Sequence, residues 1–278
     1  MKIKYLGTAA HEGLPAVFCQ CENCIEARKR GGKNLRTRSQ ALINDDLLID
    51  LNMDTHVHTL MYGIDLSQIH HCLITHAHPD HLYTDNINVR LPAYSNIENR
   101  KPFNVYGSDI VMDKIRSEFK KDDPAEDNVA FLHTVKPYEP FKVLDYEITA
   151  LPAFHDPTSG PLIYIIKQGE KCMLYAHDTG LLFEEVFEYL KNTKIYFDFI
   201  SIDCTGAFRE LDYDVHMNVE RDIIVMKRLS EQGNADSKTI VYLNHFSHNA
   251  DDVLYEEMSQ KAQKLGFNVS YDGLEVEF

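Results

Sequence analysis

The strongest constraint on this chain is a run of four potential metal ligands within six residues: His76, His78, Asp80 and His81. The run directly follows the apolar segment 69–74, which predicts a buried strand. Alternate side chains of an extended segment share one face, and a turn after the following proline brings the last two ligands to a second point. Imidazole and carboxylate groups together suit zinc, manganese or iron. A surface turn that is histidine-rich by chance is the alternative, which four ligands after one strand disfavour.

Three further candidate ligands follow other apolar runs: His155 after 147–151, Asp178 after 172–175 and His245 after 239–243. Sites are commonly built where strands end at the edge of a sheet, so we expect these side chains to lie near the histidine cluster. A single histidine after a strand is usually an ordinary loop residue. Several runs that end in the same way favour a metal centre.

Composition limits the class of protein. The chain has 278 residues, 44% hydrophobic and 26% charged, which is the balance of a globular domain. No apolar run approaches the roughly 18–20 residues of a membrane span, and no signal peptide is apparent, so we expect a cytoplasmic protein without membrane association. With 28 basic and 43 acidic residues the net charge is −15, which disfavours a nucleic-acid partner.

The order of apolar runs predicts one layered α/β (α+β) domain over residues 1–278. Strands are expected at 3–6, 41–43, 47–51, 69–75, 103–106, 147–151, 162–166, 172–175, 199–202 and 239–243. Helices are expected at 110–120, 183–192, 219–232 and 250–265. Because strands come in pairs between helices, we expect sheets with helices packed outside them. The polar segment 121–128 predicts a surface loop.

These motifs resemble the metallo-β-lactamase superfamily of hydrolases. The resemblance depends on His76-x-His78-x-Asp80-His81 with His155, Asp178 and His245, and on Gly7-Thr8, Gly13-Leu14-Pro15 and Leu48-Ile49-Asp50. Within the superfamily, the Cys-x-Cys-x-x-Cys cluster is most similar to the phosphoribosyl cyclic phosphate phosphodiesterase branch of the carbon–phosphorus lyase pathway. The resemblance spans nearly the whole chain and implies a four-layer αββα sandwich with two metal ions at one edge of the sheets.

The resemblance also implies a role for each ligand. The first metal takes His76, His78 and His155, the second takes Asp80, His81 and His245, and Asp178 bridges both. Two cations roughly 3.5–4 Å apart can share and acidify a bridging hydroxide and hold a phosphoryl group in line. Asp50 matches a position that orients a ligand histidine. The family usually has glycine two residues later, where this chain has Asn52, so the loop is expected to differ in shape.

A second metal site is predicted at three cysteines within six residues, Cys19, Cys21 and Cys24. In a reducing compartment such a cluster more often binds metal than forms disulfides. Structural zinc takes four ligands, and the resembled branch supplies the fourth from a histidine at the position of His248. A reduced thiol cluster or one local disulfide is the alternative. The other cysteines are expected to be buried and inert: Cys72, Cys172 and Cys204.

Hydrolysis of a phosphodiester requires that the leaving alkoxide be protonated or stabilised. Asp203 and His216 match positions that serve the leaving group or the phosphate in the phosphodiesterase branch. We expect His216 to contact the phosphate and act as general acid, with Asp203 orienting it. Together with the ligand Asp80 they are the candidate catalytic residues. An ordinary loop histidine and a surface aspartate are the alternative.

The remaining histidines and the basic stretch carry weaker signals. Six histidines are expected to be solvated or locally hydrogen-bonded: His11, His56, His58, His70, His71 and His133. His177 is expected to be a loop residue beside the pocket. Six basic residues lie between Arg28 and Arg38, where a solvated loop is expected and a phosphate-attracting rim formed by Arg36 or Arg38 is the alternative.

The leading functional hypothesis is a two-metal phosphodiesterase that acts on a small cyclic or ribose-linked phosphodiester through a metal-bridging hydroxide. It requires two divalent ions, zinc, manganese or iron, and one structural zinc. One alternative is a ribonuclease Z-like transfer RNA 3′-end endonuclease, although no RNA-clamping insertion is apparent. Others are a hydrolase of lactones, thioesters or lactams, and a binding module without turnover. A homodimer is expected only by analogy.

Overall fold

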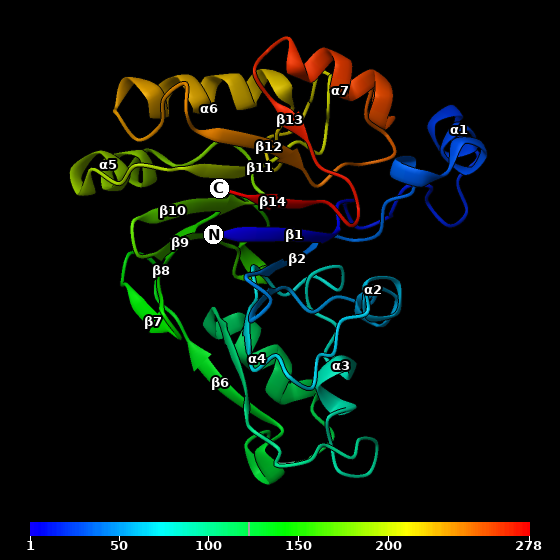
Figure 1. The fold of residues 1–278 in the computed structure, drawn as a ribbon, viewed down its shortest axis with the longest axis vertical. Coiled ribbons are helices and arrows are strands. Elements are labelled where there is room, and N and C mark those ends of the chain that lie inside the picture. The colour runs from blue at the N-terminus through cyan, green and yellow to red at the C-terminus, as the bar shows by residue number, and fades with distance from the viewer. Residues whose placement is uncertain (122) are drawn as a thin grey trace.

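Two facing β-sheets form the centre of the molecule in this computed structural model, which describes residues 1–121 and 123–278 (Figure 1). The first sheet contains β1 (Lys2–Gly7), β2 (Gln40–Ile43), β3 (Leu47–Ile49), β4 (His71–Leu73), β5 (Phe103–Gly107), β6 (Ala130–Thr134) and β14 (Glu275–Glu277), in the order β14-β1-β2-β3-β4-β5-β6. The second contains β7 (Phe141–Val143), β8 (Tyr146–Pro152), β9 (Leu162–Gln168), β10 (Lys171–Ala176), β11 (Phe199–Asp203), β12 (Ile240–Asn244) and β13 (Asn268–Val269), in the order β13-β12-β11-β10-β9-β8-β7.

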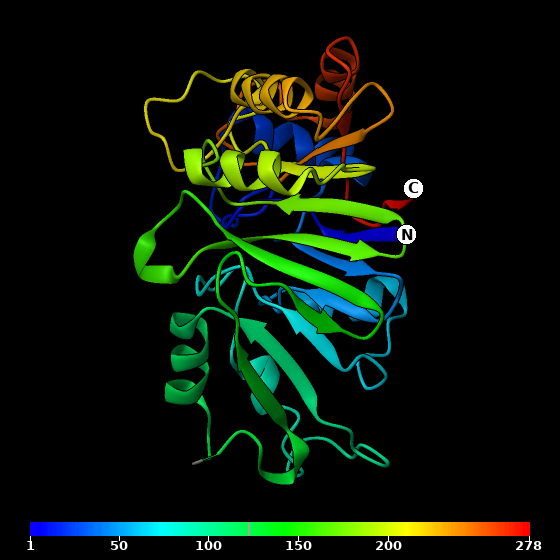
Figure 2. The same ribbon diagram turned by 90° about the vertical axis from the view of Figure 1, so that its left-hand side faces the viewer.

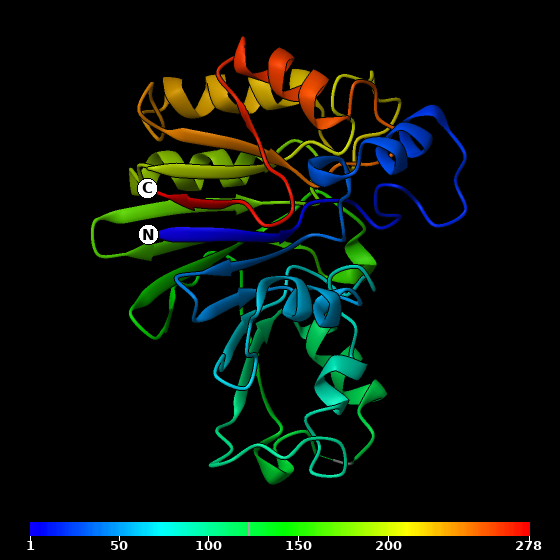
Figure 3. The ribbon, with the colours of Figure 1, turned by 45° about the vertical axis from the view of Figure 1, so that its right-hand side comes forward.

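Helices cover the outer faces of both sheets, which gives the four-layer αββα arrangement that the family resemblance implies (Figure 2). On the first sheet lie α2 (Thr55–Tyr62), α3 (Asp85–Asn88) and α4 (Asp109–Glu118), and on the second lie α5 (Glu184–Thr193), α6 (Val219–Glu231) and α7 (Tyr255–Gln263). A further helix, α1 (Glu22–Arg30), lies beside the sandwich at one end of the sheets (Figure 3). None of the helices in the described part of the chain combines the length and the apolar composition that crossing a bilayer demands.

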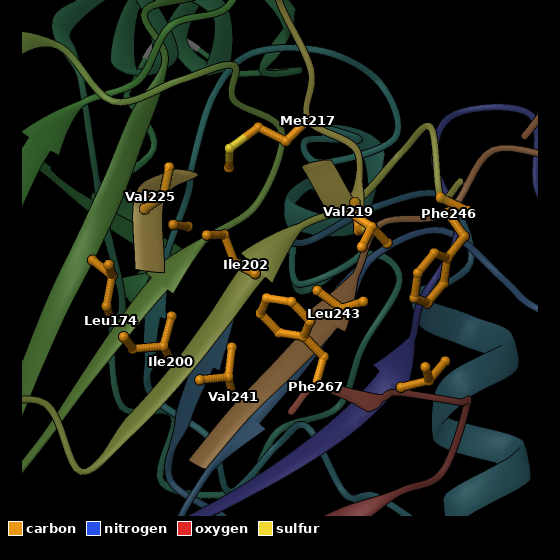
Figure 4. Close-up of a cluster of buried hydrophobic side chains, with 14 of the residues drawn as sticks. Leu174, Ile200, Ile202, Met217, Val219, Val225, Val241, Leu243, Phe246 and Phe267 are labelled. Carbon is orange, nitrogen blue, oxygen red and sulfur yellow. The ribbon is translucent and has the colours of Figure 1, made fainter. Parts of the chain in front are cut away.

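Alternation of side chains along the strands produces these layers. In β3, Leu47 and Ile49 join the apolar cluster between the sheets, while Leu48 joins the cluster under the helices of the first sheet. On the outer face of the second sheet, Figure 4 shows Val225 of α6 near Ile200 and Ile202, and Phe267 near Val241 and Leu243. Burial of such surface stabilises the fold by about 25 cal/mol per Å² of apolar area.

All ten predicted strands are present, with ends that differ by a few residues. The predicted helix 250–265 begins later, at Tyr255, and the predicted loop 121–128 contains a 3₁₀ turn, Glu126–Asn128, while residue 122 lies outside the described residues. The sequence missed β6, β7, β13 and β14 and the helices α1, α2 and α3. Most of these elements are short, so their apolar pattern is weak and they depend on neighbours for their conformation.

Parallel strands place the carboxyl ends of both sheets at one edge. β3 pairs with β4 in parallel, and β10, β11 and β12 form a parallel set in the second sheet. Across the sandwich, the Tyr164 hydroxyl in β9 donates a 2.7 Å hydrogen bond to the carbonyl oxygen of Ile74, just after β4. This buried bond joins the second sheet to the segment that begins the histidine cluster.

Tyr164→Phe should lower the free energy of unfolding by about 1–2 kcal/mol, because the buried Ile74 carbonyl loses its hydroxyl donor. Urea denaturation followed by circular dichroism measures the change. Tyr94→Phe is the matched control, since Tyr94 is 60% exposed and its change should leave the midpoint in place. Equal stability of the Tyr164→Phe variant and the wild type would contradict this account of the sheet contact.

Candidate metal centre

The structure brings all seven predicted ligands of the histidine cluster to the same sheet edge. They come from segments just after four strands: His76, His78, Asp80 and His81 after β4, His155 after β8, Asp178 after β10 and His245 after β12. Most of these side chains are buried, and His76, His81 and His245 are each at most 1% exposed. Residues as far apart in the chain as His76 and His245, 169 positions, therefore face one another in a small volume.

Two aspartates and one histidine of the site adopt the left-handed backbone conformation, which is uncommon for residues other than glycine. The φ angles are 67° at Asp50, 55° at Asp178 and 66° at His245, and each residue immediately or closely follows a strand. Such conformations are costly and persist where surrounding contacts determine them. Here they turn the chain out of the sheet so that the side chain faces the cluster instead of continuing the strand.

The ligands form two groups that share Asp178. One contains His76, His78, His155 and Asp178, and the other contains Asp80, His81, Asp178 and His245, with the ligand atoms of each group all within 4.8 Å of one another. Asp178 Oδ2 lies 3.2 Å from His76 Nε2 and 3.3 Å from His81 Nε2, so one carboxylate oxygen faces both groups. This is the arrangement in which one aspartate can bridge two cations.

Hydrogen bonds behind the cluster orient two of the imidazoles. His81 Nδ1 lies 2.7 Å from Oδ2 of the buried Asp50, and His245 Nδ1 lies 2.9 Å from Thr205 Oγ1. Donation from each Nδ1 leaves the lone pair of each Nε2 directed at the cluster. Asp50 also accepts hydrogen bonds from the amide and the hydroxyl of Thr75, which fixes the carboxylate itself.

The donor set fits divalent cations because electron-rich atoms converge there. His81 Nε2 and His245 Nε2 face each other at 3.4 Å, and His78 Nδ1 lies 3.0 Å from His76 Nε2 and 3.2 Å from His155 Nε2. Burial lowers the pKa of His76 to about 3, so this ring is neutral. Burial alone would lower the pKa of His81, but Asp50 and Asp80 raise it well above its usual value, so a cation would replace a proton there.

Asp178 provides an independent sign of fit. Burial alone would raise the pKa of Asp178, but neighbouring imidazoles, led by His245, hold it well below the ordinary range, so this carboxylate is ionised. Its Oδ1 atom is buried without a well-directed hydrogen bond, although His216 Nδ1 is 3.1 Å away and His155 Nδ1 is 3.3 Å away. An ionised, buried and incompletely paired oxygen is costly unless a charge compensates it.

The two predicted catalytic residues lie beside Asp178. His216 Nδ1 is 3.1 Å from Asp178 Oδ1 and 3.6 Å from Asp203 Oδ2. Burial alone would lower the pKa of His216, but Asp178 and Asp203 raise it to about 10, which makes the ring a proton-bearing donor. Asp203 is not the predicted surface residue of the alternative interpretation, because it is fully buried and accepts hydrogen bonds from three backbone amides.

The cysteine cluster also assembles with the predicted histidine. Ligand atoms of Cys19, Cys21, Cys24 and His248 all lie within 4.8 Å of one another, and Cys21 Sγ is 3.6 Å from His248 Nδ1. Three cysteines and one histidine are the ligand set of a Cys₃His zinc site. The cysteines are free thiols, and the remaining three, Cys72, Cys172 and Cys204, are buried as predicted.

The basic stretch matches the predicted solvated loop only in part, because Arg28, Lys29, Arg30 and Lys33 are exposed whereas Arg36 is buried. Its first three basic residues form the last turn of helix α1, and the Arg28 guanidinium there donates hydrogen bonds to the carbonyls of Cys19 and Ala16. Arg36 is 3% exposed and lies over the Phe246 ring, and Arg38 pairs with Asp54. These arginines hold the N-terminal segments together, because their side chains find partners inside the protein.

His177 is also placed differently from the prediction. It is 1% exposed, and its ring nitrogens lie 2.6 Å from Ser201 Oγ and 3.1 Å from Asn244 Nδ2, between the sheets and away from the pocket. His58 is likewise buried, with Nδ1 beside Gln40, so it is hydrogen-bonded locally and not solvated. Asn52, where the family usually has glycine, donates hydrogen bonds to two carbonyls of the adjacent loop.

Three residues near the site were missed from the sequence. His11 Nδ1 lies 3.1 Å from Asp80 Oδ1, Asp156 Oδ2 lies 3.3 Å from His78 Nε2, and Thr205 orients His245. Proximity of Asp156 to His155 was a usable signal. His11 and Thr205 stand in segments without a local motif, so only the folded chain reveals their partners.

The centre opens into a cleft of about 590 Å³. Its walls include candidate ligands on one side and the loop after β11 on the other, where His216, Tyr213 and Arg209 line the opening. Among the described residues, Arg209 is the one lysine or arginine in this lining, and its guanidinium donates a hydrogen bond to the Asn249 carbonyl. The volume and the few polar side chains that converge on it are those of a small-molecule site.

Comparisons with known proteins agree with this architecture. The sequence model of the beta-lactamase superfamily domain matches residues 47–246. The octanoyltransferase of Porphyromonas gingivalis (strain ATCC BAA-308 / W83) is 28% identical over 99% of this chain and 51% of its own length, so this chain spans about half of that relative.

Two solved structures resemble the whole chain in fold. A new diphosphatase from the PhnP family has 20% identity, covers 100% of this chain and 97% of its own, and gives a TM-score of 0.74. Zinc-bound PqqB from Methylobacterium extorquens has 18% identity, covers 100% of both chains, and gives a TM-score of 0.75.

Cys24→Ser should remove about one zinc ion per chain and lower the melting temperature, because a structural zinc contributes directly to folding. Metal analysis of the purified protein and thermal unfolding measure both effects. Cys172→Ser is the matched control, since it alters a buried thiol in β10 and should leave the metal content unchanged. A Cys24→Ser variant with the metal content of the wild type would rule out zinc at this cluster.

Proposed function

Since the chain belongs to the beta-lactamase superfamily and is a hydrolase of the metallo-β-lactamase fold, we propose that it is a two-metal phosphodiesterase acting on a small cyclic or ribose-linked phosphodiester. The observation that supports this most directly is the pair of ligand groups that share Asp178. An aspartate common to two groups suits a reaction in which the attacking and leaving oxygens of one phosphorus must both be stabilised.

Divalent cations in such a pair supply Lewis-acid stabilisation and a nucleophile at neutral pH. The residues of this chain supply the geometry. Asp50 orients His81, and Thr205 orients His245. The buried Asp178 belongs to both ligand groups and so links them. Because these side chains are fixed by hydrogen bonds before substrate arrives, little reorganisation is needed during the reaction.

His216 is suited to serve the leaving group. Its Nδ1 faces Asp178 and Asp203, which leaves Nε2 for a substrate oxygen in the cleft that the ring lines. In the proposed step the bond from phosphorus to the leaving oxygen breaks, and that oxygen takes the proton from His216. Asp203 positions the ring through Thr205, whose hydroxyl lies 3.0 Å from Asp203 and 3.3 Å from His216.

A small substrate is favoured over RNA. The net charge of −15 repels a polynucleotide, and the cleft lining contains a single arginine among the described residues. The similar structure described as a diphosphatase supports a phosphorus-centred reaction. An acyl ester or thioester is the second candidate substrate, because a relative that matches this whole chain is named an octanoyltransferase.

Asp178→Ala should lower turnover of bis-p-nitrophenyl phosphate by roughly a hundredfold or more, because both ligand groups lose their shared oxygen. Release of p-nitrophenol in the presence of manganese or zinc measures the rate. Asp113→Ala is the matched control, since that carboxylate is 77% exposed on α4. Wild-type protein that cleaves p-nitrophenyl octanoate but no phosphodiester would favour the acyl ester instead.

His216→Ala should lower the rate more for a diester with a poor leaving group than for one that releases p-nitrophenolate, because only a basic alkoxide requires the proton. We expect a loss of roughly 10² or more on the poor leaving group. The exposed His56→Ala on α2 is the control and should change neither rate. An equal loss on both substrates would assign His216 to binding and not to proton transfer.

A further inference from the structure

A second concave site lies next to the catalytic cleft and differs from it in chemistry. This groove, of about 590 Å³, is defined by Ser108, Asp109, Thr134, Val135, Lys136, Pro137, Pro152, Ala153, Phe154, His155, Pro157, Gly160, Pro161, Leu162 and Phe183. Most of these residues are apolar, and Asp109 and Lys136 are the charged side chains other than the imidazole. A hollow of this composition favours an uncharged, apolar ligand.

The walls of the groove are rigid. Four prolines contribute to the lining, and Phe154 and Phe183 pack edge to face with ring centroids 5.3 Å apart. The backbone of Phe154 is held on both sides, because its amide donates a 2.9 Å hydrogen bond to the Thr179 hydroxyl and its carbonyl accepts a 2.8 Å bond from the Gly180 amide. A preformed apolar wall loses little entropy when a ligand binds.

His155 connects the groove to the cleft, since its ring lines both hollows. The loop that carries it, between β8 and β9, also supplies Phe154, Pro157 and Pro161. The same loop is tied to the histidine cluster, because Leu162 N donates to the Thr75 carbonyl and Ala77 N donates to the Ser159 carbonyl. The cleft and the groove therefore share His155 as a common wall residue.

We infer that the groove binds an aliphatic chain attached to the ester that the metal centre cleaves. This inference rests on the proposed function for the position of the ester. The charged side chains at the rim are few, so the groove offers little to a sugar or a second phosphate. Burial of methylene groups against Phe154, Phe183 and Leu162 is the contribution that this surface can make.

The kinetic test uses p-nitrophenyl alkyl phosphodiesters with methyl, butyl and octyl chains. In the wild type kcat/KM should rise at least about tenfold from methyl to octyl, because each buried methylene adds affinity. Phe183→Ser should remove most of this increase, so that the methyl and octyl diesters differ little in kcat/KM. Phe131→Ser, a phenylalanine that is 37% exposed on β6 and outside the groove, is the matched control and should keep the preference.

A binding measurement separates this inference from the proposed function. Isothermal titration calorimetry should show octyl phosphate binding at least tenfold more tightly than methyl phosphate, with the difference lost in Phe183→Ser, whether or not any diester is hydrolysed. Thermal unfolding of each variant checks that the fold is kept. Equal affinity for the two phosphates would overturn the aliphatic site, and so would a preference for octyl phosphate that persists in Phe183→Ser. If the wild type prefers octyl phosphate but hydrolyses no diester, only the proposed phosphodiesterase activity is rejected.

Discussion

The buried carboxylate of Asp178 is the constraint around which the rest of the site is arranged. It is 3% exposed, and an ionised group at such a position is stable only when opposite charge or hydrogen bonds compensate its lost hydration. Imidazoles from three separate segments approach it within 3.3 Å: His76 and His81 after β4, His155 after β8, and His216 after β11. The cost of burying the carboxylate is thus tied to the positions of every other candidate ligand.

The sandwich meets this requirement through the direction of its strands. β3 with β4, and β10 with β11 and β12, run in parallel, so their carboxyl ends reach the same edge. Left-handed residues at these ends, including Asp50 and His245, then turn the side chains toward one point. Packing of helices on both outer faces fixes the strands, and their rigidity allows such strained conformations to persist.

The N-terminal segments support the histidine cluster without supplying any of its candidate ligands. Arg36 stacks on Phe246, the residue after His245, and Arg38 donates a hydrogen bond to the carbonyl of His11, whose ring contacts Asp80. The cysteine cluster adds a contact between this region and the His248 loop. One loop, between β8 and β9, separates two hollows of opposite character, so the fold offers a polar reaction site and an apolar neighbour on the same few residues.

The sequence by itself determined the ten main strands, the layered fold and the set of candidate ligands, because apolar alternation and clustered ligand types are local patterns that the chain order preserves. The tertiary structure decided which solitary polar residues meet. The sequence predicts that His177 lies in a loop beside the pocket and that Arg36 is solvated, yet both are buried, and His11, for which it predicts no role, contacts Asp80. The physical reason is that burial and hydrogen-bond partners depend on segments distant in the chain, and no local periodicity encodes those distances.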